Sequence, residues 1–216
     1  MIDASMIDFS FPYPFALSRG LFLPQFLLYC TLLTMRKKKL FIGIPVSRDV
    51  FRRLERVVNT FSDLPVRWSL PENYHITVLY LGHVHPDDVS WISQNLSDLF
   101  CDIESFDVVL DQVCFSGSSN DPKVVWATGP DNDQMQLIYQ RILHALNLTQ
   151  ESVCSFRPHI MLGRVGQKRW EALLEKPVVD VPVSLSVDVS SVVLFESMVQ
   201  EGKLHHELLD EFFLSE

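Results

Sequence analysis

The chain has 216 residues, enough for one domain or two tightly joined lobes around a substantial hydrophobic core. Hydrophobic residues make up 47% and charged residues 21%, which are ordinary values for a globular protein. The formal net charge of −9 argues against a protein that tracks along a nucleic-acid backbone, because that needs an extended basic surface. It does not exclude a local pocket for one phosphate or one RNA end.

Four cysteines are present, and none of them forms a C-x-x-C pair: Cys30, Cys101, Cys114 and Cys154. Their spacing argues against a zinc knuckle and against a disulfide framework. Reduced thiols in a cytoplasmic protein are therefore expected.

The N-terminal segment differs from the rest of the chain. Between Arg19 and Arg36 lie sixteen uncharged residues, interrupted by Pro24 and followed by the basic cluster R-K-K-K. A membrane anchor would agree with the positive-inside rule. The simpler interpretation is that residues 1–34 are an extension foreign to the fold and that residues 35–216 form one folded unit. We therefore expect no stable membrane partner.

Regular elements are predicted from residue 40 onward. Residues 40–44 form an apolar strand, and Ser47 with Asp49 offers cap chemistry for a helix. A second strand ends near Gly82, and a second helix begins around Pro86. The predicted inward faces of these two helices comprise Val50, Leu54, Val57, Phe61, Val89, Ile92, Leu96 and Leu99.

The second half of the chain repeats this mixture of strands and helices. Strands are predicted at residues 106–115 and 123–128, followed by a helix capped within residues 131–133. A short helix around residues 170–174 and strands within residues 183–195 follow. Residues 204–214 fit a last strand or a short helix. Hairpin-length connections among these elements favour an α+β fold with antiparallel sheet over a doubly wound parallel one.

Two strand-like stretches begin with a histidine. In N-Y-H-I-T-V-L-Y-L-G a strand would point His75 and Thr77 to one face. It would point Ile76, Val78 and Tyr80 to the other.

The second stretch, F-R-P-H-I-M-L-G-R, places His159 at an equivalent position 84 residues later. Two related halves would bring both imidazoles to one site. With an ordinary pKa of about 6.5, one imidazole can accept a proton while the other donates one. Phosphodiester cleavage needs both steps and no metal, provided that hydroxyl and guanidinium groups stabilise the phosphate charge.

The sequence resembles the two-histidine (2H) phosphoesterase superfamily, in particular the LigT-like RNA 2′,3′-cyclic phosphodiesterases, also called 2′-5′ RNA ligases. The resemblance rests on L-P-E-N-Y-H-I-T-V-L-Y-L-G (70–82), W-A-T-G (126–129) and F-R-P-H-I-M-L-G-R (156–164), and it extends over residues 40–214. It implies two pseudo-symmetric lobes, each an antiparallel sheet with covering helices, around a central cleft.

The resemblance also implies an activity and roles for individual residues. Such enzymes open a 2′,3′-cyclic phosphate at an RNA end to leave a 2′-phosphate, and some join 2′-5′ linkages in reverse. His75 would donate a proton to the leaving oxygen and His159 would accept one from water. Thr77 and Arg164 would contact the phosphate. RNA ends or small nucleotides are the expected partners, without cofactor or metal, and the protein is expected to be a monomer.

One position departs from the family pattern. Met161 stands where the second motif usually has threonine, and a thioether cannot donate a hydrogen bond to phosphate. Losing one hydrogen bond to a charged group lowers transition-state stabilisation by about 1.5–3 kcal/mol. Arg157, two residues before His159, is a candidate to compensate.

Several alternatives remain open at this point. A non-catalytic module that binds nucleotides or RNA ends would explain the altered second motif. Metal-dependent hydrolysis would use His83 with His85, or His205 with His206, although these side chains also fit exposed surface positions. Cys154 and His159 could also form a nucleophilic pair. Tyr80, Trp68 or Phe156 could stack on a base, although core packing explains each of these three aromatic residues equally well.

Overall fold

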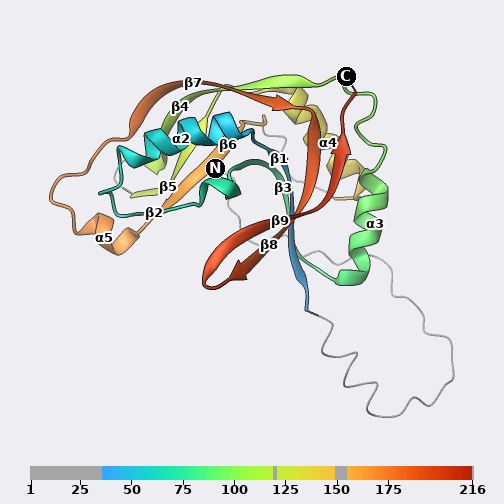
Figure 1. The fold of residues 1–216 in the computed structure, drawn as a ribbon, viewed down its shortest axis with the longest axis horizontal. Helices are drawn as coiled ribbons and strands as arrows, with labels where there is room; N and C mark the ends of the chain where they lie inside the picture. The colour runs from blue at the N-terminus through green and yellow to red at the C-terminus, as the bar shows by residue number, and fades with distance from the viewer. Residues whose placement is uncertain (1–35, 119–120, 149–154, 216) are drawn as a thin grey trace, which may run out of the picture.

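The computed structural model describes residues 36–118, 121–148 and 155–215, which form a large antiparallel sheet with a few helices (Figure 1). The predictions for residues 1–34 and for Cys154 lie outside the described residues. The first elements are β1 (Lys38–Pro45), α2 (Arg48–Asn59), β2 (Val66–Trp68), the 3₁₀ helix η1 (Pro71–Asn73), β3 (His75–Val84) and α3 (Pro86–Leu96). The remaining elements are β4 (Phe106–Ser118), β5 (Asp121–Thr128), α4 (Asp133–Ala145), β6 (His159–Val165), α5 (Gln167–Glu171), β7 (Asp180–Val189), β8 (Ser191–Gln200) and β9 (Lys203–Phe213).

The strands form two halves that meet at the centre of the sheet. Their order is β7-β4-β5-β6-β3-β1-β8-β9, and β2 pairs with the outer end of β6. The halves touch through β3 and β6, which pair at Ile76 and Ile160. The predicted α+β fold with two related antiparallel halves is therefore confirmed. The two sheets are not separate, however, because this pairing joins them into one.

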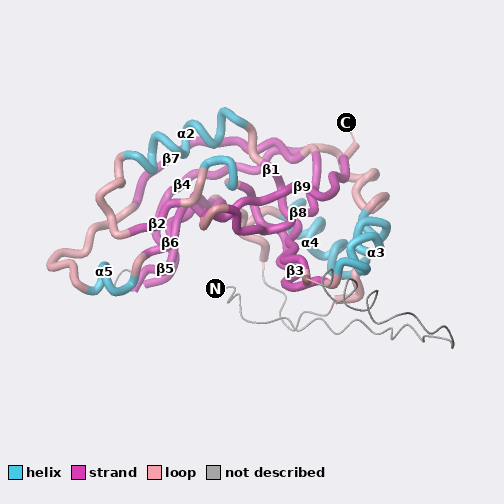
Figure 2. The backbone as a smooth tube through the Cα atoms, turned by 60° about the horizontal axis from the view of Figure 1, so that its bottom comes forward, coloured by secondary structure: helices cyan, strands magenta, loops and turns pink. Residues whose placement is uncertain are grey.

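The two halves repeat the same local unit. In each, a strand leads into a helix and the chain returns to pair beside that strand: β1, α2 and β3 in one half, and β5, α4 and β6 in the other. Figure 2 shows the strands and helices of both units along the backbone, and the strand order places β5, β6, β3 and β1 in the middle of the sheet. The halves also brace one another, because Arg53 of α2 donates a 2.8 Å hydrogen bond to the Ser184 carbonyl of β7.

Helix starts follow the predicted cap chemistry. The Ser47 hydroxyl accepts from the Val50 amide at the start of α2, and the Asn132 side chain accepts from the Met135 amide at the start of α4. His85 caps α3, since its Nδ1 accepts from an amide in the first turn. Residues 203–213 form a strand, which settles the prediction that was left open for the C-terminal segment.

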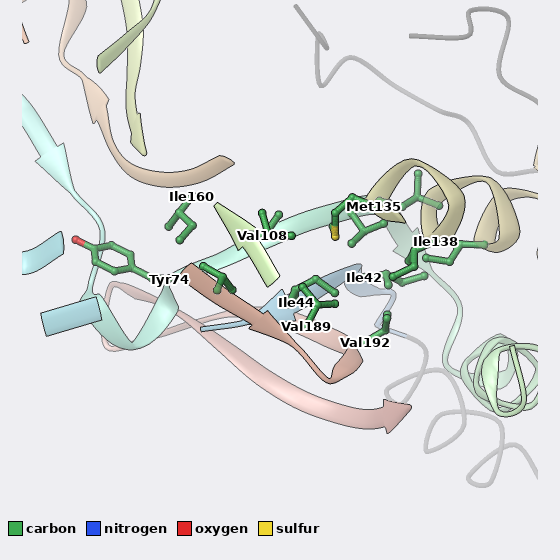
Figure 3. Packing of buried hydrophobic residues seen from close by; sticks show 14 of the residues in the cluster. Ile42, Ile44, Tyr74, Val108, Met135, Ile138, Ile160, Val189 and Val192 are labelled. Carbon is green, nitrogen blue, oxygen red and sulfur yellow. The ribbon is translucent and has the colours of Figure 1, made fainter. Parts of the chain in front are cut away.

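Buried side chains from both halves form one hydrophobic core. Figure 3 shows Ile42 and Ile44 of β1 in this core together with Val108, Ile138 and Ile160. Ile76 and Ile160, the pair that joins the halves, are both completely buried. None of the described helices has the length and apolar character needed to cross a membrane.

Truncating the central pair should destabilise the whole fold. We expect Ile160→Ala to lower the free energy of unfolding by about 2–5 kcal/mol, because it leaves a cavity where the halves meet. Val109→Ala, on a strand side chain that is 50% exposed, should lower it much less. Urea denaturation followed by circular dichroism measures both, and equal losses would contradict a central role for this contact.

Candidate active site

β3 and β6 bring the four motif positions together on one face of the sheet. With Ile76 opposite Ile160 in an antiparallel pair, Thr77 lies opposite His159 and the first histidine lies opposite Met161. Both isoleucines point into the core, so the positions on either side of them point to the opposite face. All four motif side chains are partly exposed there. The predicted meeting of the two motifs is thus present in the structure.

Hydrogen bonds fix the orientation and the tautomer of His75. Its Nδ1 lies 2.7 Å from the Asn73 carbonyl oxygen, which can only accept, so Nδ1 carries the proton. Nε2 lies 2.9 Å from the Thr77 hydroxyl, which donates to it when the ring is neutral. Gly43 leaves room for the ring, since a Cβ there would lie 3.3 Å from the His75 Cδ2 atom.

The surroundings of His75 favour its neutral form. Burial against aromatic rings, including Phe41 at 4.6 Å between ring centroids, lowers its pKa to about 4. The hydrogen bond to the Asn73 carbonyl opposes this shift. The positive charges that His206 and His159 would carry lower the pKa further.

His159 is held in a similar way at the start of β6. Its Nδ1 donates to the Arg157 carbonyl at 3.1 Å, and its ring lies 4.8 Å from the Trp126 ring. Burial lowers the pKa of His159. The Arg157 hydrogen bond opposes that shift, and the guanidinium charge of the same residue adds to it.

Arg157 precedes β6 and is anchored by side-chain hydrogen bonds rather than by strand geometry. Its Nε donates to the Thr128 hydroxyl at 3.2 Å and to the Gly129 carbonyl at 3.1 Å. Thr128 is fully buried and donates in turn to the Pro158 carbonyl. These contacts hold the guanidinium beside the second histidine, where we expected a compensating cation.

Arg164 lies farther along β6 and returns to the side of Met161. The pairing of β5 with β6 contains a register shift, and Leu162 and Gly163 are buried in succession. Alternation then resumes with Arg164 exposed. No hydrogen bond or ion pair within the described residues connects Arg164 to the two histidines.

A second register shift corrects the prediction for Tyr80. We expected Tyr80 to point with Ile76 and Val78 to the face opposite His75 and Thr77. The pairing of β1 with β3 shifts register here and leaves Val78 and Leu79 both buried, so Tyr80 emerges on the face of Thr77. Its ring is 48% exposed, and its hydroxyl shares a 3.4 Å hydrogen bond with the Thr77 hydroxyl. Trp68 and Phe156, the other stacking candidates, pack against the core.

His206 is the main site residue that sequence reasoning misplaced. It was assigned to the surface, but its ring is half-buried and packs edge-on against His75, with centroids 5.1 Å apart. Asn73 links the two, because its side chain accepts from the His206 amide and donates to the Leu204 carbonyl of β9. No spacing along the chain signals this contact, since β9 reaches the site only through the sheet order.

Within the described part of the chain, no group of three or more histidine, cysteine, aspartate and glutamate side chains is placed to hold a metal ion. Of the four histidines named as alternative ligands, His85 caps a helix and His206 packs against His75.

Comparison with known proteins gives consistent matches. The LigT like Phosphoesterase family model matches residues 44–126. An RNA 2′,3′-cyclic phosphodiesterase of Thermotoga maritima is 26% identical over 154 residues, covering 68% of this chain and 81% of the relative. An enzyme of the same name from Aeropyrum pernix is 28% identical over 155 residues, covering 68% of this chain and 86% of the relative.

Solved structures agree in fold. The apo crystal structure of E. coli LigT has a TM-score of 0.66 and 18% identity, and the match covers 84% of this chain and 99% of that one. The resemblance carried by the two histidine motifs is thus supported by the family match, the curated relatives and the shared fold. Residues 44–126 therefore carry the match to the LigT like Phosphoesterase family model, and the chain shares the fold of LigT.

Proposed function

We propose that this phosphoesterase opens 2′,3′-cyclic phosphates at RNA ends and leaves a 2′-phosphate and a free 3′-hydroxyl. The observation that carries the proposal is the shared geometry of His75 and His159. Each commits Nδ1 to a backbone carbonyl and lies on the same face of adjacent strands, so each has Nε2 for proton transfer. The name of the curated relatives supports this substrate class.

In the proposed reaction, His159 removes a proton from water as the water oxygen bonds to phosphorus. The bond from phosphorus to the 3′ oxygen breaks, and His75 donates its Nε2 proton to that oxygen. The Thr77 hydroxyl and the Arg157 guanidinium stabilise the charge on the non-bridging oxygens. The same groups with exchanged roles would join a 2′-5′ linkage in the reverse direction.

His75 needs an added proton for this role. Its pKa of about 4 keeps it neutral in the free protein near pH 7. An anionic phosphate beside the ring favours the charged imidazolium and raises that pKa. Substrate binding therefore favours protonation of His75, the proposed general acid.

The decisive experiment offers an oligonucleotide ending in a 2′,3′-cyclic phosphate, with EDTA present, and identifies the product isomer. We expect a 2′-phosphate. His75→Gln and His159→Gln should each lower the rate by about 10²–10⁴-fold. The control His144→Gln changes an exposed histidine in the last turn of α4 and should keep the full rate.

Full activity of either motif variant, or loss of activity in EDTA, would refute the mechanism. Binding without any product would instead favour the non-catalytic module. The observation behind that second candidate is Met161, which cannot donate to phosphate.

A hydroxyl at position 161, where the family motif usually has threonine, should not harm catalysis. We expect Met161→Thr to raise the rate on a 2′,3′-cyclic phosphate, or at least not to reduce it, because a second hydroxyl would stand across from His75. Met161→Val matches the new shape without a donor and should not show the gain. Single-turnover rates compare the three proteins, and a collapse with threonine would argue against this arrangement.

The pH dependence of kcat/KM should be shifted to lower pH than expected for two histidines with an ordinary pKa. Activity needs one protonated and one neutral imidazole, and burial lowers the pKa of both histidines below 6.5. Above the higher of the two values the pair has no acid, so kcat/KM should fall as pH rises through 6 to 8. The fall in kcat should come at higher pH, since bound phosphate raises the pKa of His75. A kcat/KM that rises over this range would contradict the assignment.

A further inference from the structure

A strip of lysine, histidine and aromatic side chains continues from His75 along the same face of the sheet. Lys39 and Phe41 alternate with buried residues of β1, so they share the face of Gly43 beneath the first histidine. His83 of β3 lies opposite Lys39 in the strand register, and Tyr80 lies opposite Phe41. From β9, His206 packs against Phe41 with ring centroids 4.8 Å apart.

Acidic side chains are few on this face. In the described residues of β1, β3, β8 and β9, the register places one carboxylate on the face of His75, that of Glu211 opposite Val193, and it accepts a hydrogen bond from the Ser191 hydroxyl. The whole chain, in contrast, carries a net charge of −9. The neighbouring Lys38 is neutralised by Glu196. Lys39 has no such ion pair among the described residues, and its charge is close enough to lower the pKa of His206. Lys39 therefore presents a positive charge on this face of an acidic protein.

His206 offers a hydrogen-bond donor to this strip. Its pKa is lowered to about 4, chiefly by burial and then by Lys39 and His205, so the ring is neutral near pH 7. Its Nδ1 is buried and forms no hydrogen bond of good geometry within the described residues, and the nearby His205 backbone only partly opposes the lowering of the pKa. A buried N–H without a partner is costly, which favours the tautomer with the proton on Nε2. That N–H can donate to an anion on the partly exposed side of the ring.

We propose that Lys39 and His206 form a second anion subsite, which holds the phosphate on the 5′ side of the terminal nucleotide. This rests on the function proposed above and narrows its substrate class to oligonucleotides or 5′-phosphorylated ends, in preference to a bare nucleoside 2′,3′-cyclic phosphate. Lys39 lies four residues along β1 from Gly43, or about 13 Å at the rise of a strand, and its flexible side chain can reach back toward the first site. The exposed Tyr80 ring lies opposite Phe41, between Thr77 and His83 along β3, where a nucleobase could pack.

The test compares kcat/KM on three substrates: a nucleoside 2′,3′-cyclic phosphate, the same compound with a 5′-phosphate, and a dinucleotide ending in the cyclic phosphate. We expect the native protein to favour the last two by about tenfold or more, as for a hydrogen bond to a charged group. The preference should weaken as salt is added. A preference for the dinucleotide alone would show that the second nucleoside, not the phosphate, is recognised, and would overturn the proposal.

Variants assign the preference to the subsite. Lys39→Gln and His206→Phe should bring the ratio of kcat/KM values close to one. Lys39→Arg keeps the charge and His206→Gln keeps a donor, so both should retain most of the preference. Lys38→Gln, a neighbouring lysine paired with Glu196, should leave the ratio unchanged.

Two results would overturn the subsite. One is equal rates on all three substrates by the native protein. The other is an equal loss on every substrate in Lys39→Gln and His206→Phe, which would indicate a structural role. Hydrolysis of the bare nucleoside cyclic phosphate reports the underlying function separately, and if no substrate is turned over, both proposals fail.

Discussion

The pairing of β3 with β6 is the constraint on which the site depends. Because strand side chains alternate, burying Ile76 and Ile160 forces the neighbouring motif positions onto the opposite face. A slip of one residue would exchange the two faces of the strand that slips, which would bury His75 in the case of β3 and His159 in the case of β6. The junction consists of a single paired position, so apolar burial rather than a long hydrogen-bond ladder sets its register. The hydrophobic core thereby positions two polar side chains encoded far apart.

Each histidine then receives its orientation from the backbone two residues before it. The Asn73 carbonyl accepts from Nδ1 of His75, and the Arg157 carbonyl accepts from Nδ1 of His159. The residue that supplies each carbonyl is itself tied down through its side chain, by β9 in the first case and by the end of β5 in the second. The two halves thus share one solution for fixing the tautomer, and a proton donor or acceptor is presented without rearrangement.

Sequence patterns predicted what is local and periodic. The cap at Ser47, the repeated strand and helix unit, and the alternation around His75 and His159 all follow from nearest-neighbour chemistry. The register shifts within β3 and β6 did not follow, because a bulge depends on how two strands fit together. Those shifts decide where Tyr80 and Arg164 point. His206 was misjudged for the same reason, since only the sheet order brings β9 to the first motif.

The difference between the two motifs bears on the direction of proton transfer. Thr77 hydrogen-bonds to Nε2 of His75, whereas Met161 cannot form an equivalent bond, and no described side chain hydrogen-bonds to Nε2 of His159. The Arg157 guanidinium also keeps the pKa of His159 low, so its Nε2 lone pair stays available to a water molecule. His75 is more strongly desolvated, and an arriving phosphate anion relieves the unfavourable charge of its imidazolium. Both features agree with the roles proposed above, in which His159 is the neutral base and His75 is the acid that gains its proton as substrate binds.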